Sequence, residues 1–344
     1  RNRLAFGGIM FKYIVKRILI SLVVLLGVSV IIYFMVRLIP NNYIMQKFSS
    51  QLMSGAVSQE SIDIYLKLYG LDDNSFLGIC KGYIGWVGNM LRGNLGVSFI
   101  YRKPVAQVIS ENMWVSFSIA LIATIFQFLI AIPLGVSSAT HQYSVRDYTV
   151  TVLTMLGISL PTYFFGAIVI KVFAVDLGWF PASGLIDASA TFPNTIGGFF
   201  QKLGSMAWHL VLPIFVSVLL SIGGLMRYTR TNTLEVLSAD YIRTARAKGL
   251  SEKRVIYKHA FRNTLIPLVT LLAGILPSLF GGMMITEQVF GINGIGNLAY
   301  KATTQADIPF VMGYNMFLAI LSVLGTLFSD IMYSVVDPRV RLSR

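Results

Sequence analysis

Charged residues are scarce in this chain. Only 12% of its 344 residues are Asp, Glu, Lys or Arg, whereas 55% are hydrophobic. A soluble globular protein carries about 25% charged residues. This deficit, together with several apolar runs of about 20 residues, excludes an ordinary soluble domain and predicts a polytopic helical membrane protein.

Cysteine and histidine are also rare. The single Cys80 excludes an intramolecular disulfide and a cysteine metal cluster, and the three histidines lie in separate segments. The net charge of +13 would suit a nucleic-acid partner, but the basic residues gather at the ends of apolar runs and form no aromatic-interleaved groove. This placement is typical of residues that set membrane topology.

Motifs for nucleotide binding, metal binding and hydrolysis are absent from the sequence. It contains no G-x-x-x-x-G-K-[ST] loop, no H-E-x-x-H, no acidic calcium loop and no G-x-S-x-G elbow. Few charges lie within the apolar runs, which argues against an ion-coupled pump with a proton relay. We therefore expect no catalytic residue, metal or cofactor in this chain, and a partner must supply the energy for any transport.

Six apolar runs predict an all-α integral membrane protein with six transmembrane helices. The chain then divides into an extension before Met10 (1–9), a first span with its approach (10–36), an external insertion (37–112) and a core with five further spans (113–344). The insertion is nearly balanced in charge, with seven Lys/Arg and five Asp/Glu. The six spans are predicted at about residues 18–36, 114–136, 148–174, 209–226, 265–285 and 311–335.

The distribution of basic residues predicts the orientation. Between Arg227 and Arg262 there are nine Lys/Arg against three Asp/Glu. Short loops rich in Lys and Arg stay on the cytoplasmic side. With six spans, both termini would then be cytoplasmic, and the composition fits a bacterial plasma membrane.

The basic loop within 227–263 has the pattern of a helix–turn–helix. Ser238 is expected to cap a helix over about 239–248, and Gly249 to end it in the left-handed conformation. Ser251 is then expected to cap a second helix, with Glu252 near its positive N-terminal end.

This loop resembles the EAA loop of ABC-importer permeases in the dipeptide, oligopeptide and nickel group. The family pattern is Glu-Ala-Ala, three residues and Gly, and these places hold Arg243, Thr244, Ala245 and Gly249 here. The resemblance implies a coupling helix that docks into a groove of a cytoplasmic ATPase subunit. The alternative is a basic amphipathic helix lying on anionic lipid head groups. The implied coupling residues are Tyr241, Arg243, Thr244, Ala245, Ala247, Lys248, Gly249 and Leu250.

Other phrases resemble the first permease subunit of peptide importers. They are YGLD (69–72), GNLGVS (93–98), LGWFPASG (177–184) and DPRVRL (337–342). The last outer loop departs from the family at two places, because Asn293 replaces a usual Pro and Ala306 an often basic residue. This loop is expected to fold partly back as a short helix. Its matching residues are Glu287, Val289, Phe290, Gly294, Gly296, Asp307 and Pro309.

The resemblance covers nearly the whole chain from Met10 and implies a type I ABC importer permease fold. It implies one membrane subunit of an importer of dipeptides or oligopeptides that works by alternating access. The implied partners are a homologous second permease, two ATPase subunits that bind ATP and Mg²⁺, and an extracytoplasmic peptide-binding protein. Nickel or glutathione could replace the peptide, because nothing in the spans fixes the substrate.

Four residues are candidates for a translocation path or gate: Pro161, Phe164, Glu287 and Asp330. Pro161 interrupts the third run and predicts a kink, which either lines a path or is a tolerated packing kink. Asp330 is an ionisable group near the inner end of the last span. It is a functional candidate by default, and the alternative is an interfacial pair with a basic residue.

Two other classes of function remain to be distinguished. A stand-alone channel or secondary transporter would be active alone and would show inverted internal repeats, which the sequence does not show. A receptor or scaffold that has lost transport would signal in response to peptide without accumulating it.

Overall fold

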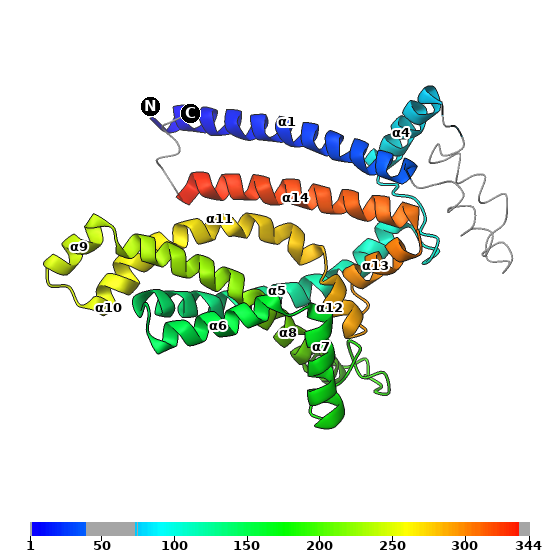
Figure 1. The fold of residues 1–344 in the computed structure, drawn as a ribbon. Coiled ribbons are helices and arrows are strands. Elements are labelled where there is room, and N and C mark those ends of the chain that lie inside the picture. The colour runs from blue at the N-terminus through cyan, green and yellow to red at the C-terminus, as the bar shows by residue number, and fades with distance from the viewer. Residues whose placement is uncertain (1, 39–72, 74, 337–344) are drawn as a thin grey trace. The chain divides into compact units, whose positions relative to one another are not determined.

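The computed structural model describes residues 2–38, 73 and 75–336, and this part of the chain is helical (Figure 1). Its only extended pairing is an isolated bridge between Val97 and Pro104. Residues 39–72 and 74 of the predicted insertion lie outside the described residues, as do the YGLD and DPRVRL phrases. The chain divides into two compact units, Arg1–Asn112 with Leu298–Leu327 and Met113–Asn297 with Phe328–Arg344.

In the first unit, α1 (Asn2–Arg37), α4 (Phe76–Leu91) and the start of α14 (Ile308–Val336) share one hydrophobic core. The α4 helix begins because the Ser75 hydroxyl accepts a hydrogen bond from the Gly78 N–H at 3.1 Å. The described end of the insertion therefore packs on the first and last spans. The buried residues of this core are Tyr33, Val36, Trp86, Ile308 and Met312.

The loop that precedes α5 (Val105–Thr140) is attached to the start of α14 through Asp307. This fully buried carboxylate accepts hydrogen bonds from the Ser98 hydroxyl and from the Ile100 N–H at 3.1 Å. The Tyr101 hydroxyl donates to the Leu298 carbonyl at 3.0 Å. Burial, with Asp307 nearby, raises the pKa of Tyr101 to about 12, which keeps this hydroxyl a donor.

The second unit contains most of α5 and the helices that follow it to the start of α13. Two long helices contain an internal proline, Pro133 in α5 and Pro213 in α8. The remaining bounds are α6 (Val145–Ser159), α7 (Thr162–Val169), η1 (Ile170–Asp176), α8 (Ile196–Leu237), α9 (Asp240–Ala247), α10 (Glu252–Arg254), η2 (Val255–Ala260), α11 (Phe261–Phe280), α12 (Met284–Val289) and α13 (Ile295–Thr304).

The helices correspond to the predicted spans. Four are long and apolar enough to cross a membrane, Val15–Val36, Val105–Thr140, Ile196–Leu237 and Ile308–Phe328. The pair formed by α6 and by α7 with η1 passes the same test together. The 20-residue α11 corresponds to the predicted fifth span.

Two spans differ from their predicted shape. The third is broken rather than kinked, because α6 and the α7–η1 segment meet at 104°. Pro161 lacks an N–H and cannot continue α6, and the apolar residue Val169 then packs with Phe290 and Val216. The fourth span begins at Ile196 and not near residue 209, since the Thr195 hydroxyl accepts from the Gly198 N–H and starts the helix early.

The α6 and α8 helices run antiparallel and approach closely at two glycines. A Cβ added at Gly157 would lie 2.8 Å from the Leu219 carbonyl oxygen, and one at Gly223 would lie 2.6 Å from the Thr154 carbonyl oxygen. Only glycine permits this backbone contact, as is common where membrane helices pack tightly. These contacts fix the register between the two helices.

The segment predicted to be the last outer loop contains two short helices, α12 and α13, so the prediction that part of it is a short helix is confirmed. In Figure 1 the α12 helix lies close to α7. A Cβ at Gly166 of α7 would meet Val289 at 3.0 Å, which shows how tightly these two helices pack.

Candidate functional site

The predicted coupling loop forms a helical hairpin between α8 and α11 (Figure 1). The first helix, α9, covers Asp240–Ala247, within one residue of the predicted bounds. Ser238 does not cap it, which corrects the prediction. Because α8 continues to Leu237, Ser238 belongs to its end and its hydroxyl donates to the Glu235 carbonyl at 2.7 Å.

Gly249 ends α9 as predicted, with a φ of +76°. Its N–H donates to the Arg246 carbonyl at 2.9 Å, and the Leu250 N–H donates to the Ala245 carbonyl at 3.4 Å. This pair of bonds is the Schellman motif, which requires a left-handed residue and therefore favours glycine. The motif reverses the chain so that the second helix can return toward α11.

Ser251 occupies the predicted cap position of the second helix, but its side chain makes no capping hydrogen bond. Its backbone carbonyl accepts from the Arg254 N–H at 2.8 Å and the Val255 N–H at 3.0 Å. The helix continues without a break from α10 through the π-helical η2 into α11. The second arm of the hairpin thus continues directly into α11, and the first arm follows α8 after a two-residue turn.

The two arms of the hairpin are held together by a small apolar core. Ile242 and Ala245 of α9 pack against Val255 and Ala260 of η2, and Leu250 of the turn covers them. Ala245 is therefore buried against the second arm, and its predicted role in coupling stays a prediction. Its small side chain lets the two arms approach.

The exposed side of α9 carries five of the predicted coupling residues: Tyr241, Arg243, Thr244, Ala247 and Lys248. The Tyr241 hydroxyl accepts a hydrogen bond from the Asn263 amide at 2.9 Å, which fixes the ring against the start of α11. The Arg243 guanidinium lies 3.7 Å from the Asp240 carboxylate, and both are exposed. This side of α9 is therefore a basic, exposed surface.

An ion pair also braces the turn. The Arg246 guanidinium donates to the two carboxylate oxygens of Glu252, at 2.6 and 3.2 Å. This hydrogen bonding lowers the pKa of Glu252 and raises the pKa of Arg246. The sequence had assigned Glu252 to the helix N-terminus alone, and its pairing across the turn was not predicted.

The candidate path residues lie in different surroundings. Pro161 is the N-cap of α7, at the 104° break, and Phe164 on α7 is 49% exposed. Asp330 lies on α14, and its side chain falls outside the described part of the structure. The path role of these residues stays a prediction.

Glu287 is only 1% exposed and is surrounded by hydrogen-bond donors. Its carboxylate accepts from the Ser116 hydroxyl at 2.6 Å, the Met283 N–H at 3.0 Å and the Asn297 N–H at 2.9 Å. The Ser116 oxygen in turn accepts from the Ile295 N–H at 2.8 Å. In this arrangement Glu287 joins α5, α12 and α13, and both of its carboxylate oxygens accept hydrogen bonds from within the protein.

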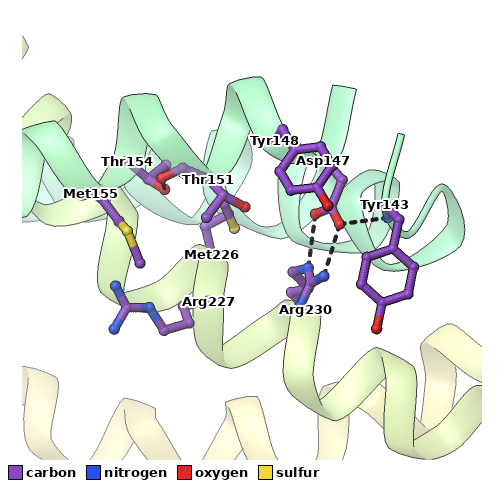
Figure 2. Close-up of a pocket in the computed structure, with 9 residues that line it drawn as sticks. All are labelled: Tyr143, Asp147, Tyr148, Thr151, Thr154, Met155, Met226, Arg227 and Arg230. Carbon is purple, nitrogen blue, oxygen red and sulfur yellow. Dashed lines mark hydrogen bonds and ion pairs between the residues drawn. The ribbon is translucent and has the colours of Figure 1, made fainter. Parts of the chain in front are cut away.

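A second buried carboxylate, Asp147, was missed in the sequence. It accepts two hydrogen bonds from Arg230, from Nε at 2.9 Å and from Nη2 at 2.8 Å, and one from the Tyr143 N–H (Figure 2). The Ser138 hydroxyl donates another. Ser144 three residues before it caps α6 through the Asp147 N–H at 3.3 Å. The Ser-x-x-Asp spacing was a signal in the sequence for the start of this helix. No sequence signal indicated that Arg230 on α8 would pair with Asp147.

The comparisons with known proteins identify the family. Residues 131–342, more than half of the chain, match the family described as binding-protein-dependent transport system inner membrane component. The chain belongs to this family. As a family member with several long apolar helices, it is a multi-pass inner-membrane protein.

Relatives in the family are similar over nearly their whole length. The oligopeptide transport system permease protein AppB of Bacillus subtilis is 36% identical over 96% of this chain and 99% of that protein. A putative peptide transport system permease protein of Brucella abortus is 34% identical over 96% and 99%. The dipeptide transport system permease protein DppB of Alkalihalophilus pseudofirmus is 31% identical over 96% and 100%.

The fold of this family member also matches a solved structure. A chain of the MetNI methionine ABC transporter, in an inward-facing conformation, superposes with a TM-score of 0.52 at 18% identity. The match covers 67% of this chain and 97% of the other. At this identity it shows the fold alone, and it confirms the importer-permease fold that the sequence predicted.

Proposed function

We propose that this chain is a transmembrane permease subunit of an ATP-driven importer of dipeptides or oligopeptides. The observation that carries the proposal is the 36% identity to an oligopeptide permease over 96% of this chain. The other relatives described above are also named for peptide or dipeptide transport. The substrate would be captured by an extracytoplasmic binding protein and delivered to this subunit and a homologous second permease.

The α9–α10 hairpin is the proposed contact with a cytoplasmic ATPase subunit. The exposed basic side of α9 would dock on the ATPase, while the buried residues Ile242 and Val255 keep the hairpin rigid. Because α9 follows the 42-residue α8 after a two-residue turn, a displacement of the docked hairpin moves the end of that helix. ATP and Mg²⁺ would bind the ATPase subunits and not this chain.

This proposal sets the orientation of the protein in the membrane. The hairpin and both termini would lie in the cytoplasm, since the segment from Arg227 to Arg262, which contains the hairpin, has nine Lys/Arg against three Asp/Glu. The exposed end of α13, at Thr303 and Thr304, would then face the binding protein.

A matched pair of substitutions at Gly249 tests the coupling role. Valine at a φ of +76° is strained by about 1–2 kcal/mol and disrupts the Schellman turn, although no atom lies within 4 Å of its Cβ. Asparagine tolerates the left-handed region. We expect Gly249→Val to insert in the membrane but to lose ATP-driven uptake of labelled peptide and co-purification of the ATPase, and Gly249→Asn to keep both.

Three outcomes would contradict the proposal. Unchanged peptide uptake by Gly249→Val would refute the coupling role of the hairpin. Transport by the purified chain alone in liposomes, without ATP, would favour a channel or secondary transporter. Accumulation of nickel, with no accumulation of peptide, would refute the proposed substrate class.

A further inference from the structure

A cavity of about 270 Å³ lies between α6 and α8, beside the Asp147–Arg230 ion pair (Figure 2). On one side of the cavity the helices are in backbone contact at Gly157 and Gly223, and on the other side the ion pair bridges them. The helices are thus held together on both sides of the cavity, and the threonines between are too small to fill it. The lining residues are Tyr143, Asp147, Tyr148, Thr151, Thr154, Met155, Met226, Arg227 and Arg230.

The lining carries one uncompensated positive charge. It contains two arginines and one aspartate. Arg230 is neutralised by Asp147 at 2.8 Å, whereas Arg227 has no ion-pair partner among the described residues. Figure 2 shows the Arg227 side chain pointing away from the ion pair, toward Met155. The free guanidinium therefore lies where the polar and apolar parts of the lining meet.

The cavity lies at the edge of the apolar layer. The run 203–226 of α8 contains no Asp, Glu, Lys or Arg, and Arg227 is the first charge that follows it. Arg146 and Asp147 are likewise the first charges at the start of α6. Arginine side chains at this depth extend toward the phosphates of the bilayer. Tyr148, 60% exposed, is the type of side chain found at the same level.

An apolar surface continues from the cavity along α6. Val152, Met155 and Leu156 are 54%, 48% and 56% exposed and follow the cavity toward the centre of the span. A ligand that suits this site has an anionic group for Arg227 and an apolar chain for α6. A phospholipid has both parts in this order.

We propose that the α6–α8 cavity binds the head group of an anionic phospholipid. The phosphate would pair with Arg227, and one acyl chain would lie on Val152, Met155 and Leu156. A bound lipid would add to the contacts between α6 and α8. The proposal requires only that the chain spans a membrane, so it can hold or fail independently of the peptide substrate.

Lipid binding by the complex, purified from its own membrane in mild detergent, tests the proposal. Native mass spectrometry with added phosphatidylglycerol or phosphatidylcholine would give the dissociation constants. We expect Arg227→Gln to weaken phosphatidylglycerol binding about fivefold, the effect of one arginine near a phosphate. We expect Thr151→Trp, which fills the cavity without changing charge, to weaken it as much. Phosphatidylcholine should bind more weakly than phosphatidylglycerol.

Arg146→Gln is the matched control. It removes the same charge one residue from Asp147, but Arg146 does not line the cavity, so binding should be unchanged. An excess of inorganic phosphate should not raise the melting temperature of the complex. This measurement distinguishes a site for a lipid from a site for free phosphate.

Three results would overturn the proposal. The first is wild-type phosphatidylglycerol binding by Arg227→Gln. The second is an equal loss in Arg146→Gln, which would indicate general surface charge. The third is loss of a second membrane subunit from Thr151→Trp with unchanged lipid binding, which would make the cavity a protein interface.

Discussion

The second unit contains two buried carboxylates, Asp147 and Glu287, that are stabilised in different ways. They are 3% and 1% exposed, so burial does not distinguish them. Asp147 is paired with a full positive charge, the guanidinium of Arg230. Glu287 accepts hydrogen bonds from a hydroxyl and two backbone N–H groups, and no cation contacts it among the described residues.

The difference lies in where the partners come from. A buried carboxylate needs either a counter-charge or several good donors. Two donors to Glu287, the N–H groups of Met283 and Asn297, are four and ten residues away, so Glu287 mainly fixes the local path of the chain around α12. Arg230 is 83 residues from Asp147, so that pair fixes one helix against another. Loss of Glu287 should disturb a loop, and loss of Asp147 should loosen two helices.

The largest effect is expected for Glu287→Ala. It leaves the Ser116 hydroxyl and two backbone N–H groups without their acceptor. Each unsatisfied buried donor costs about 1–3 kcal/mol, so the free energy of unfolding should fall by about 3 kcal/mol or more. Thermal unfolding of the purified protein in detergent would measure the loss.

The control for this variant is Glu111→Ala. Glu111 pairs with Lys103 at 2.9 Å, but both side chains are about half exposed, and an exposed pair contributes about 0–1 kcal/mol. Equal melting temperatures for the two variants would mean that the hydrogen bonds to Glu287 are not what stabilises this region.

A smaller effect is expected for Asp147→Asn. The Arg230 side chain is 25% exposed and can turn toward water or lipid phosphate once its partner is lost. We therefore expect a loss of about 1–2 kcal/mol, below the 3–5 kcal/mol typical of a fully buried pair. A double-mutant cycle with Arg230→Gln isolates the interaction between the two residues. If the two single losses simply add in the double variant, the pair does not join the helices.

The sequence predicted the helices well because their signals are local. Five of the six apolar runs correspond to one helix each and the third to the broken pair of α6 and α7–η1, and Gly249 marked a helix end through its own conformational freedom. The 104° break was not predicted in size, since Pro161 only prevents α6 from continuing. The direction taken afterwards depends on the packing of Val169 against Phe290, residues far apart in the chain.

The candidate site was predicted less completely, because its decisive contacts are not local. The pairing of Asp147 with Arg230 depends on the register set at Gly157 and Gly223, which no pattern in the chain reveals. The donors to Glu287 include backbone N–H groups, which every non-proline residue carries. Ser238 failed as a cap because α8 extends to Leu237 and uses its hydroxyl.

The smallest effect is expected for the exposed pair Arg246–Glu252, which has the same chemistry as Asp147–Arg230 without the burial. The pKa of Glu252 is lowered from 4.5 by Arg246, so the pair stabilises the hairpin above that value and loses its effect as the pH falls through the lowered pKa. Both side chains are about half exposed, and such a pair contributes about 0.5 kcal/mol.

Hydrogen exchange of the hairpin amides in Glu252→Gln and wild type, compared at equal pH, measures this contribution. Exchange in the variant should be about twofold faster at pH 6, and the difference should disappear as the pH falls through the lowered pKa of Glu252. The intrinsic exchange rates cancel in this ratio, so any remaining difference comes from the pair. A ratio that stays at twofold as the pH falls would mean that Glu252 acts through packing or through hydrogen bonds that do not require its charge. The charge would then matter at Asp147 but not here, and exposure alone would account for the difference between the two pairs.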